Sequence, residues 1–166
     1  MRYLLLLLLP LWLWAGESRL LLPGVSVHED HENQFGEAYN GVNLGIGYEI
    51  NDFRRYEQSY FTANVMLFND SFSHPQLTVG FGHAIRFEGR YFDTAVGLAG
   101  FVGLKKLYES DDRTGRTGKY GLMGGVAPVV AFYRGDWSLN LLYVPSVEVG
   151  DYDLTGFAFA YLGWKF

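Results

Sequence analysis

Alternation of large apolar residues with small or polar residues is the feature that most constrains the fold of this chain. Over residues 41–50, every second residue is large and apolar, and the residues between are glycine, asparagine or glutamate. The same period recurs over 77–87, 92–104, 120–133 and 136–145. Successive side chains of a β-strand point to opposite faces, so each segment predicts a strand with one apolar face.

The alternating segments predict eight antiparallel strands separated by turn residues. Strands of about ten residues, rich in aromatic side chains, are typical of transmembrane barrels. We therefore expect an all-β chain: an eight-stranded antiparallel outer-membrane β-barrel. A soluble lipocalin-like barrel or sandwich is the alternative, but it would leave the large apolar face of every strand in water. The expected strands are 20–28, 39–50, 54–68, 76–87, 91–105, 119–133, 136–146 and 153–166.

Short and long connections alternate between these strands. Outer-membrane barrels have short periplasmic turns and longer external loops. We therefore expect both termini in the periplasm and the long loops outside the cell. The short connections are 51–53, 88–90 and 134–136, and the long ones are 29–38, 69–75, 106–118 and 147–152.

The N-terminus has the features of an export signal. Arg2 precedes an apolar stretch over 3–14, and small residues follow at Ala15 and Gly16. This arrangement predicts a signal peptide over 1–18, with cleavage after Ser18 or after Ala15. An uncleaved anchor helix is the alternative. The remaining residues, 19–166, are then one barrel domain.

Composition narrows the chemistry. The chain of 166 residues has no cysteine, which excludes thiol nucleophiles, disulfides and cysteine-based zinc sites. Its net charge of −5 argues against nucleic-acid binding. After the N-terminus, no apolar run approaches the roughly 20 residues that a membrane helix needs. We expect a monomer, because a closed barrel has no free edge that requires a partner.

The inward face predicts a hollow interior above a polar floor. Three charged inward residues, Glu49, Arg86 and Asp93, fall near the periplasmic ends of their strands. The other inward positions are mostly glycine and alanine, which leave volume suited to a hydrocarbon chain. The alternative is that these glycines serve strand curvature and close packing. The small inward residues are Gly45, Gly47, Gly80, Gly82, Ala84, Ala95, Gly97, Ala99, Gly121, Gly125, Ala127 and Ala131.

Two prolines, Pro128 and Pro145, lie within expected strands. Proline cannot donate to a strand ladder, so it belongs where pairing is interrupted. In a barrel, such an interruption is a lateral gap through which a lipid tail can enter. A tolerated bulge is the alternative.

The outer rim brings together residues suited to acyl-transfer chemistry. His28 ends the first strand, and Asp70 and Ser71 begin the next external loop. A serine beside a histidine can act as nucleophile and base, with a carboxylate orienting the imidazole. Solvated loop residues are the alternative, and His31 and His74 are competing bases. Two further possibilities are a cation site in the run 29–32 and contacts with lipid phosphates from Lys105, Lys106, Arg113, Arg116 and Lys119.

Several of these positions resemble the lipid A palmitoyltransferases of bacterial outer membranes, the PagP family. Residues 68–72, FNDSF, resemble that family's aromatic-x-Asp-Ser-aromatic motif, and 80–82, GFG, match its Gly-aromatic-Gly. Residues 22–28 resemble the segment that ends in the family's essential histidine. Pro128 and the triplet 143–145, YVP, resemble the strand prolines that frame its lipid gate. The family's N-terminal amphipathic helix is absent here, because the first expected strand begins next to the cleavage site.

The resemblance implies transfer of a palmitoyl chain from the sn-1 position of a phospholipid to lipid A, without a metal or organic cofactor. His28, Asp70 and Ser71 then form the catalytic group, with their individual roles open. Gly82 matches the floor of the acyl pocket, and Pro128 and Pro145 match the lateral gate. The partners are a phospholipid donor, a lipid A or lipopolysaccharide acceptor and the outer membrane.

Two other function classes remain open. One is a non-enzymatic outer-membrane barrel for adhesion or for passage of a hydrophobic molecule. The other is a lipid A deacylase of a different eight-stranded family. That family carries neighbouring His and Ser residues on a late strand, and no such pair follows His83.

Overall fold

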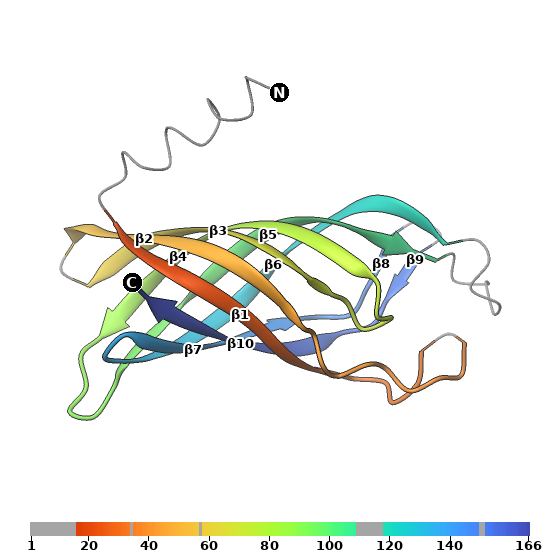
Figure 1. Cartoon of the computed structure of the whole chain (residues 1–166), viewed down its shortest axis with the longest axis horizontal. Coiled ribbons are helices and arrows are strands. Elements are labelled where there is room, and N and C mark those ends of the chain that lie inside the picture. Colours follow the sequence, from red (N-terminus) through yellow and green to blue (C-terminus); the bar gives the residue numbers. More distant parts are fainter. Residues whose placement is uncertain (1–15, 34, 57, 109–117, 150–151) are drawn as a thin grey trace, which may run out of the picture.

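A closed antiparallel barrel accounts for most of the chain. The computed structural model describes residues 16–33, 35–56, 58–108, 118–149 and 152–166. Eight strands close the barrel in the order β1-β10-β7-β6-β5-β4-β3-β2, and two short strands form a separate hairpin (Figure 1). The predicted eight-stranded barrel is confirmed. The strands are β1 (Glu17–His28), β2 (Gly45–Tyr56), β3 (Ser59–Asn69), β4 (Pro75–Phe87), β5 (Asp93–Leu107), β6 (Lys119–Arg134), β7 (Trp137–Val144), β8 (Val147–Val149), β9 (Tyr152–Leu154) and β10 (Phe157–Lys165).

The outer face of the barrel is apolar on all sides. Leu122 is 74% exposed, Leu44 68% and Phe81 61%, and similar residues cover the other strands. A surface of this kind is stable in lipid rather than in water. The ladders around the barrel satisfy most backbone groups between strands, as a bilayer requires. The chain is therefore an all-β transmembrane barrel. No helix long and apolar enough to cross a membrane occurs among the described residues.

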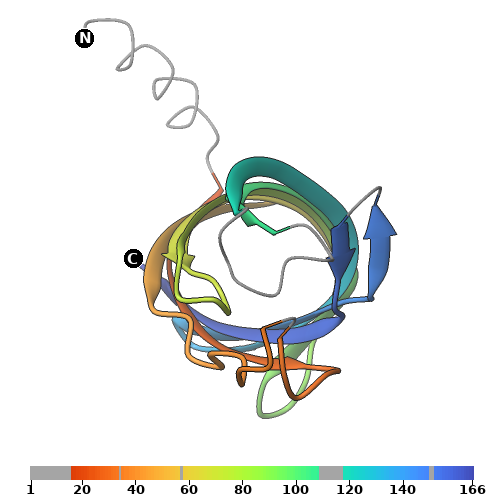
Figure 2. The ribbon, with the colours of Figure 1, turned by 90° about the vertical axis from the view of Figure 1, so that its right-hand side faces the viewer.

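The strand boundaries place the long and short connections at opposite ends of the barrel (Figure 1). The short ones span 57–58, 88–92 and 135–136. The connections after β1, β3, β5 and β7 lie at the other end, as predicted, but the one after β3 spans 70–74 and is no longer than 88–92. The connection after β7 contains the hairpin of β8 and β9, which lies beside the barrel opening (Figure 2).

The predicted connection at 51–53 is wrong. Strand β2 continues to Tyr56, and the chain reverses at 57–58. Asn51 is fully buried, and its amide nitrogen donates to the Glu49 carboxylate at 3.0 Å. Asn51, one of the polar residues that suggest a turn, is therefore an inward-facing strand residue. The beginning of this strand also differs from the expected residue 39, because residues 39–44 belong to the preceding loop.

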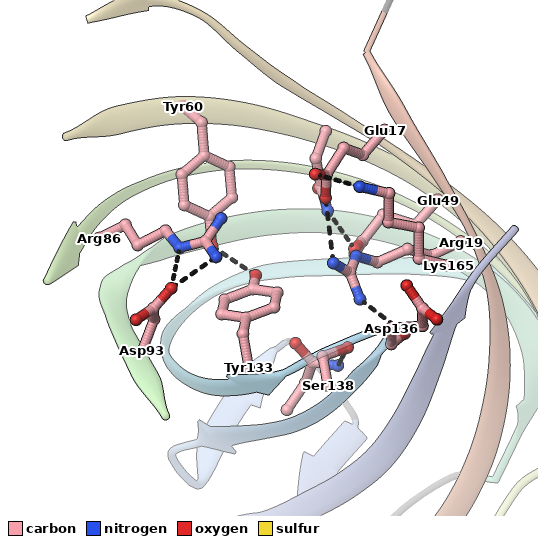
Figure 3. A network of polar contacts seen from close by, with 12 residues as sticks. Glu17, Arg19, Glu49, Tyr60, Arg86, Asp93, Tyr133, Asp136, Ser138 and Lys165 are labelled. Atoms are coloured by element: carbon pink, nitrogen blue, oxygen red, sulfur yellow. Dashed lines mark hydrogen bonds and ion pairs between the residues drawn. The ribbon is translucent and has the colours of Figure 1, made fainter. Parts of the chain in front are cut away.

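A network of polar side chains forms the floor of the barrel (Figure 3). Arg86 and Asp93 form an ion pair at 2.7 Å, and Glu49 is 4% exposed. This confirms the predicted polar floor. The hydroxyl groups of Tyr60 and Tyr133 add a buried hydrogen bond across it.

The first residues of β1 join the same floor. Glu17 pairs with buried Arg19 at 3.0 Å and with Lys165 at 2.7 Å. Residues 1–15 lie outside the described residues, so the signal peptide stays a prediction. Cleavage after Ala15 would keep the ion pairs of Glu17, whereas cleavage after Ser18 would remove them.

Candidate active site

A cavity of about 460 Å³ occupies the half of the barrel near the long loops. The predicted hollow interior is therefore present. Its inner part is mainly apolar, and its mouth is polar. The walls include Met66, Phe68, Phe101, Leu142, Phe159 and Tyr161, and the mouth includes Ser26, His28, Asp70, Ser71 and Lys105.

Only some of the small inward residues create this volume. Gly80, Ala99, Gly125 and Ala127 line the cavity. Other inward glycines and alanines allow close packing instead, because their neighbours fill the space beside them. Ala84, Ala95 and Ala131 pack around Tyr60 and Tyr133 in the floor, and side chains added at Gly45, Gly47 or Gly97 would overlap neighbouring strands.

Gly82 faces inward one position below the cavity. It is not among the lining residues, whereas Gly80 is. A Cβ atom at Gly82 would lie 3.0 Å from the Thr62 hydroxyl oxygen and 3.6 Å from the Ala99 Cβ. Gly82 therefore supports the cavity from beneath, and its role in limiting chain length stays a prediction.

Asp70 holds the loop that carries Ser71. One of its carboxylate oxygens accepts the backbone N–H groups of Phe72 at 3.0 Å and His74 at 2.9 Å. The Asp70 backbone N–H also donates to the His74 carbonyl at 2.8 Å. This turn is closed at both ends, so it fixes Ser71 at the mouth of the cavity.

The second carboxylate oxygen of Asp70 faces Lys105 on β5. The Lys105 ammonium lies 3.6 Å from it. Asp70 is 3% exposed and the Lys105 side chain 15% exposed, so the pair is inside the barrel mouth. Lys105 also lies 5.8 Å from the centre of the Phe72 ring. Its ammonium therefore points into the barrel rather than toward a membrane surface.

His28 is held between aromatic rings. Its imidazole stacks on Tyr39 with ring centres 4.0 Å apart, and Phe157 lies 5.5 Å away. The Tyr39 hydroxyl donates to Thr155 at 3.2 Å. These contacts fix the plane of the imidazole at the cavity mouth without using its nitrogen atoms.

His28 and Ser71 line the same cavity mouth. The Ser71 hydroxyl lies 3.5 Å from that of Ser26, the next inward residue of β1 below His28. Among the described residues, no hydrogen bond joins His28 to Asp70 or Ser71. The structure thus brings the three predicted residues together, but the contacts of Asp70 run to its own loop and Lys105.

The two other candidate bases, His31 and His74, do not face the cavity as His28 does. His31 is exposed, and it does not line the cavity. His74 is engaged outside the cavity: Nδ1 bonds the Phe72 carbonyl at 2.6 Å, and Nε2 lies 3.0 Å from the Tyr108 hydroxyl. His28 is therefore the histidine that faces the cavity among the described residues.

An aromatic cluster surrounds the Ser71 loop, and sequence patterns gave no sign of it. Phe35 contacts Phe72 and Tyr108, and Phe72 also contacts Tyr39. These rings come from three separate long loops. Periodicity identifies strands and does not tell which loop residues meet, so this cluster emerges only from the three-dimensional arrangement.

The barrel wall is interrupted beside the cavity. Within the described strands, the β6–β7 ladder runs from Val129↔Leu142 to Arg134↔Trp137. The remaining part of β6, residues 119–128, pairs with β5 alone. Pro128 is the first residue beyond this ladder, and Pro145 follows the end of β7 and lines the cavity. The predicted interruption is present beside Pro128, whereas Pro145, which was expected within a strand, lies beyond the end of β7. Gly124 and Val126 line the cavity along the interruption.

A second irregularity occurs where β1 meets β2. Their ladder covers Glu17–Leu21, and pairing resumes at the bridge between Val25 and Val42. Because the backbone hydrogen bonds resume, this side of the wall is closed again near the rim. On its other side, β1 has a bulge between Pro23 and Val25 in its ladder with β10.

No group of three or more His, Asp or Glu residues in the described part of the chain is arranged to hold a metal ion. In the run 29–32, Asp30 accepts a hydrogen bond from Thr155 at 3.2 Å, and Glu29 accepts one from Tyr143. Arg113 and Arg116 lie outside the described residues.

Comparisons with known proteins identify similar folds only. No family model and no curated protein matches the chain. Neisserial surface protein A, NspA, is similar in structure, with a TM-score of 0.45 and 10% identity over 90% of this chain and 96% of that chain. The Yersinia pestis outer membrane protein Ail has a TM-score of 0.43 and 10% identity over 91% of this chain and 99% of that chain. At this identity, neither protein's function transfers to this chain.

Proposed function

We propose that this barrel is an outer-membrane acyltransferase. It moves a palmitoyl chain from the sn-1 position of a phospholipid to a hydroxyacyl chain of lipid A. Its short turns face the periplasm, and the cavity mouth faces outward. The observation that carries the proposal is one cavity with a mainly apolar interior, a mouth that holds His28 and Ser71, and a side wall interrupted at Pro128.

The cavity supports an acyl substrate by its size and lining. Its volume of about 460 Å³ falls within the range of roughly 300–1,000 Å³ that ligand pockets occupy. The acyl chain lies along Met66, Phe159 and Ala127 and leaves its ester at the polar mouth. There, His28 acts as the base and Ser71 contacts the reacting ester or the acceptor hydroxyl.

The floor supports an enzyme over passage of a hydrophobic molecule through the lumen. Arg19, Glu49 and Tyr133 are each at most 4% exposed and fill the section beneath the cavity. An apolar molecule crossing this section would have to displace buried, paired charges at high cost. A closed floor with an open side wall suits a substrate that enters and leaves from the membrane.

Mass spectrometry of lipid A tests the proposal. Cells that express the wild-type barrel should gain lipid A carrying one additional palmitoyl chain. His28→Ala and Ser71→Ala should abolish the gain, whereas the matched rim variants His31→Ala and Ser73→Ala should keep it. All variants should show the heat-modifiable gel migration of an inserted barrel.

Absence of the added chain in cells with inserted wild-type barrel would favour a non-enzymatic barrel. A gain that persists in both His28→Ala and Ser71→Ala would place the active site elsewhere.

A further inference from the structure

Lys105 is a buried cation at the level of the proposed reacting groups. Strand β5 places it on the same inward face as Ala95, Ala99 and Gly103, and its side chain is 15% exposed. It lines the cavity together with His28 and Ser71. Taking a lysine charge out of water is costly, so a charge held at this mostly buried position needs a reason.

The ion pair with Asp70 does not use all of the hydrogen-bonding capacity of the Lys105 ammonium. At 3.6 Å, the ammonium nitrogen and the Asp70 oxygen are beyond a good hydrogen-bond distance. An ammonium group has three N–H donors. Lys105 can therefore keep its counter-charge and turn a proton toward a second acceptor in the cavity mouth.

Lys105 differs in the sign of its charge from the carboxylates that line the cavity mouth. The charged residues that line the cavity are Asp30, Glu32, Asp70 and Lys105, and Lys105 is the one lysine or arginine of the described lining. An acyl-transfer site must stabilise negative charge that develops on the ester carbonyl oxygen. Carboxylates would destabilise that negative charge, whereas an ammonium stabilises it.

We propose that Lys105 is a further catalytic residue, which stabilises the oxyanion of acyl transfer; this inference rests on the proposed function. The acceptor hydroxyl oxygen of lipid A attacks the ester carbonyl carbon, and the carbonyl electron pair moves onto the carbonyl oxygen beside the Lys105 ammonium. The pair then returns, the bond to the glycerol oxygen breaks, and the lysophospholipid takes the proton released by the attacking hydroxyl. The palmitoyl chain ends on the acceptor oxygen, so no further reactant is needed.

Steady-state kinetics in detergent micelles with a labelled phospholipid donor tests this role. Lys105→Met keeps the length of the side chain and removes its charge. It should lower kcat by about 10²–10³-fold with little change in KM, as loss of one oxyanion donor does elsewhere. Lys105→Arg should keep part of the rate. Arg90→Met, at an exposed residue of the 88–92 connection at the other end of the barrel, should leave the rate within about twofold of wild type.

Two lipid probes separate oxyanion stabilisation from binding of the headgroup phosphate. Both keep the chain and the phosphate. One has an ether in place of the sn-1 ester, and the other has an α,α-difluoro ketone there, which forms a tetrahedral adduct. Lys105→Met should weaken binding of the ketone and leave binding of the ether lipid unchanged.

Equal weakening of both probes, a loss confined to KM, or an unchanged kcat would overturn the role of Lys105. If the wild-type barrel transfers no acyl chain, the proposed function itself fails. An active wild type with an equally active Lys105→Met removes only this inference, so the two failures are distinguishable.

Discussion

The hydroxyl oxygens of Tyr60 and Tyr133 lie 2.6 Å apart in the buried floor of the barrel. They come from β3 and β6, which are not neighbours in the wall, so the bond spans the lumen (Figure 3). The Tyr133 ring also lies between two guanidinium groups, with Arg19 at 4.9 Å and Arg86 at 5.0 Å from its centre. This arrangement ties opposite sides of the barrel together beneath the cavity.

Tyr60→Phe and Tyr133→Phe should each lower the free energy of unfolding by about 1–1.5 kcal/mol, because each removes the same buried hydrogen bond. The double variant should be less destabilised than the sum of the two. Urea unfolding in lipid vesicles measures both quantities, with exposed Tyr91→Phe as the control. Strictly additive losses would show that the two hydroxyls do not interact.

Removal of the Asp70 carboxylate should destabilise the rim. Asp70→Ala takes the acceptor from two backbone N–H groups and leaves Lys105 without its counter-charge. Loss of one partner of a buried ion pair costs about 3–5 kcal/mol. Asp70→Asn, which can still accept the loop hydrogen bonds, should cost less. These values come from urea unfolding in vesicles.

Adding Lys105→Met to Asp70→Ala checks the cause of that loss. The second substitution should recover part of the stability, because it removes the uncompensated charge. A further loss in the double variant would show that the ion pair is not the source of the effect.

Chain-length selection should depend on the small residues beneath the acyl chain. Gly82→Met should favour shorter donors, since its side chain pushes Thr62 toward the cavity floor. Gly80→Met should shorten the preferred chain further, because Gly80 lines the cavity directly. Competition between phospholipids of different chain length reports the preference. Ala63→Met, on the outward face of the neighbouring strand β3, is the matched control. Unchanged palmitate preference in both folded glycine variants would show that this part of the cavity does not select chain length.

The lateral gap should control how fast a donor lipid enters. In the double variant Pro128→Ala and Pro145→Ala, two backbone N–H groups are restored at the end of the β6–β7 ladder. Additional pairing there would narrow the gap, so transfer should be slower in membranes. Pro75→Ala, at the start of β4, is the control. A transfer rate equal to that of wild type would argue that lipids enter elsewhere.

Periodicity predicted most of the barrel because half of every strand faces lipid. The alternation holds wherever an apolar outer face is required, and it fixed which residues of β2, β4 and β5 point inward. It failed at 51–53, where polar residues resemble a turn but belong to strand β2, and Asn51 contributes to the buried floor. A floor is built from several strands at once, and no single segment contains its pattern.

The candidate site was predictable in part. His28 and Ser71 follow from the strand ends and the family resemblance. The sequence offered Lys105 only as a contact for lipid phosphates, whereas its side chain points into the barrel. The pairing of Lys105 with Asp70 and the stacking of Tyr39 on His28 join different loops and strands. Such contacts depend on the closed barrel, so the local sequence does not encode them.

The outer part of β6, which does not pair with β7, makes thermal stability and catalytic turnover compete. Between β5 and β6 the ladder has fifteen residue pairs, but between β6 and β7 it has six. The seam with fewer bonds lies directly beside the cavity, so heating should part the wall there early. Any change that strengthens this seam also narrows the passage to the membrane. A variant with a higher unfolding temperature at this seam is therefore expected to transfer acyl chains more slowly.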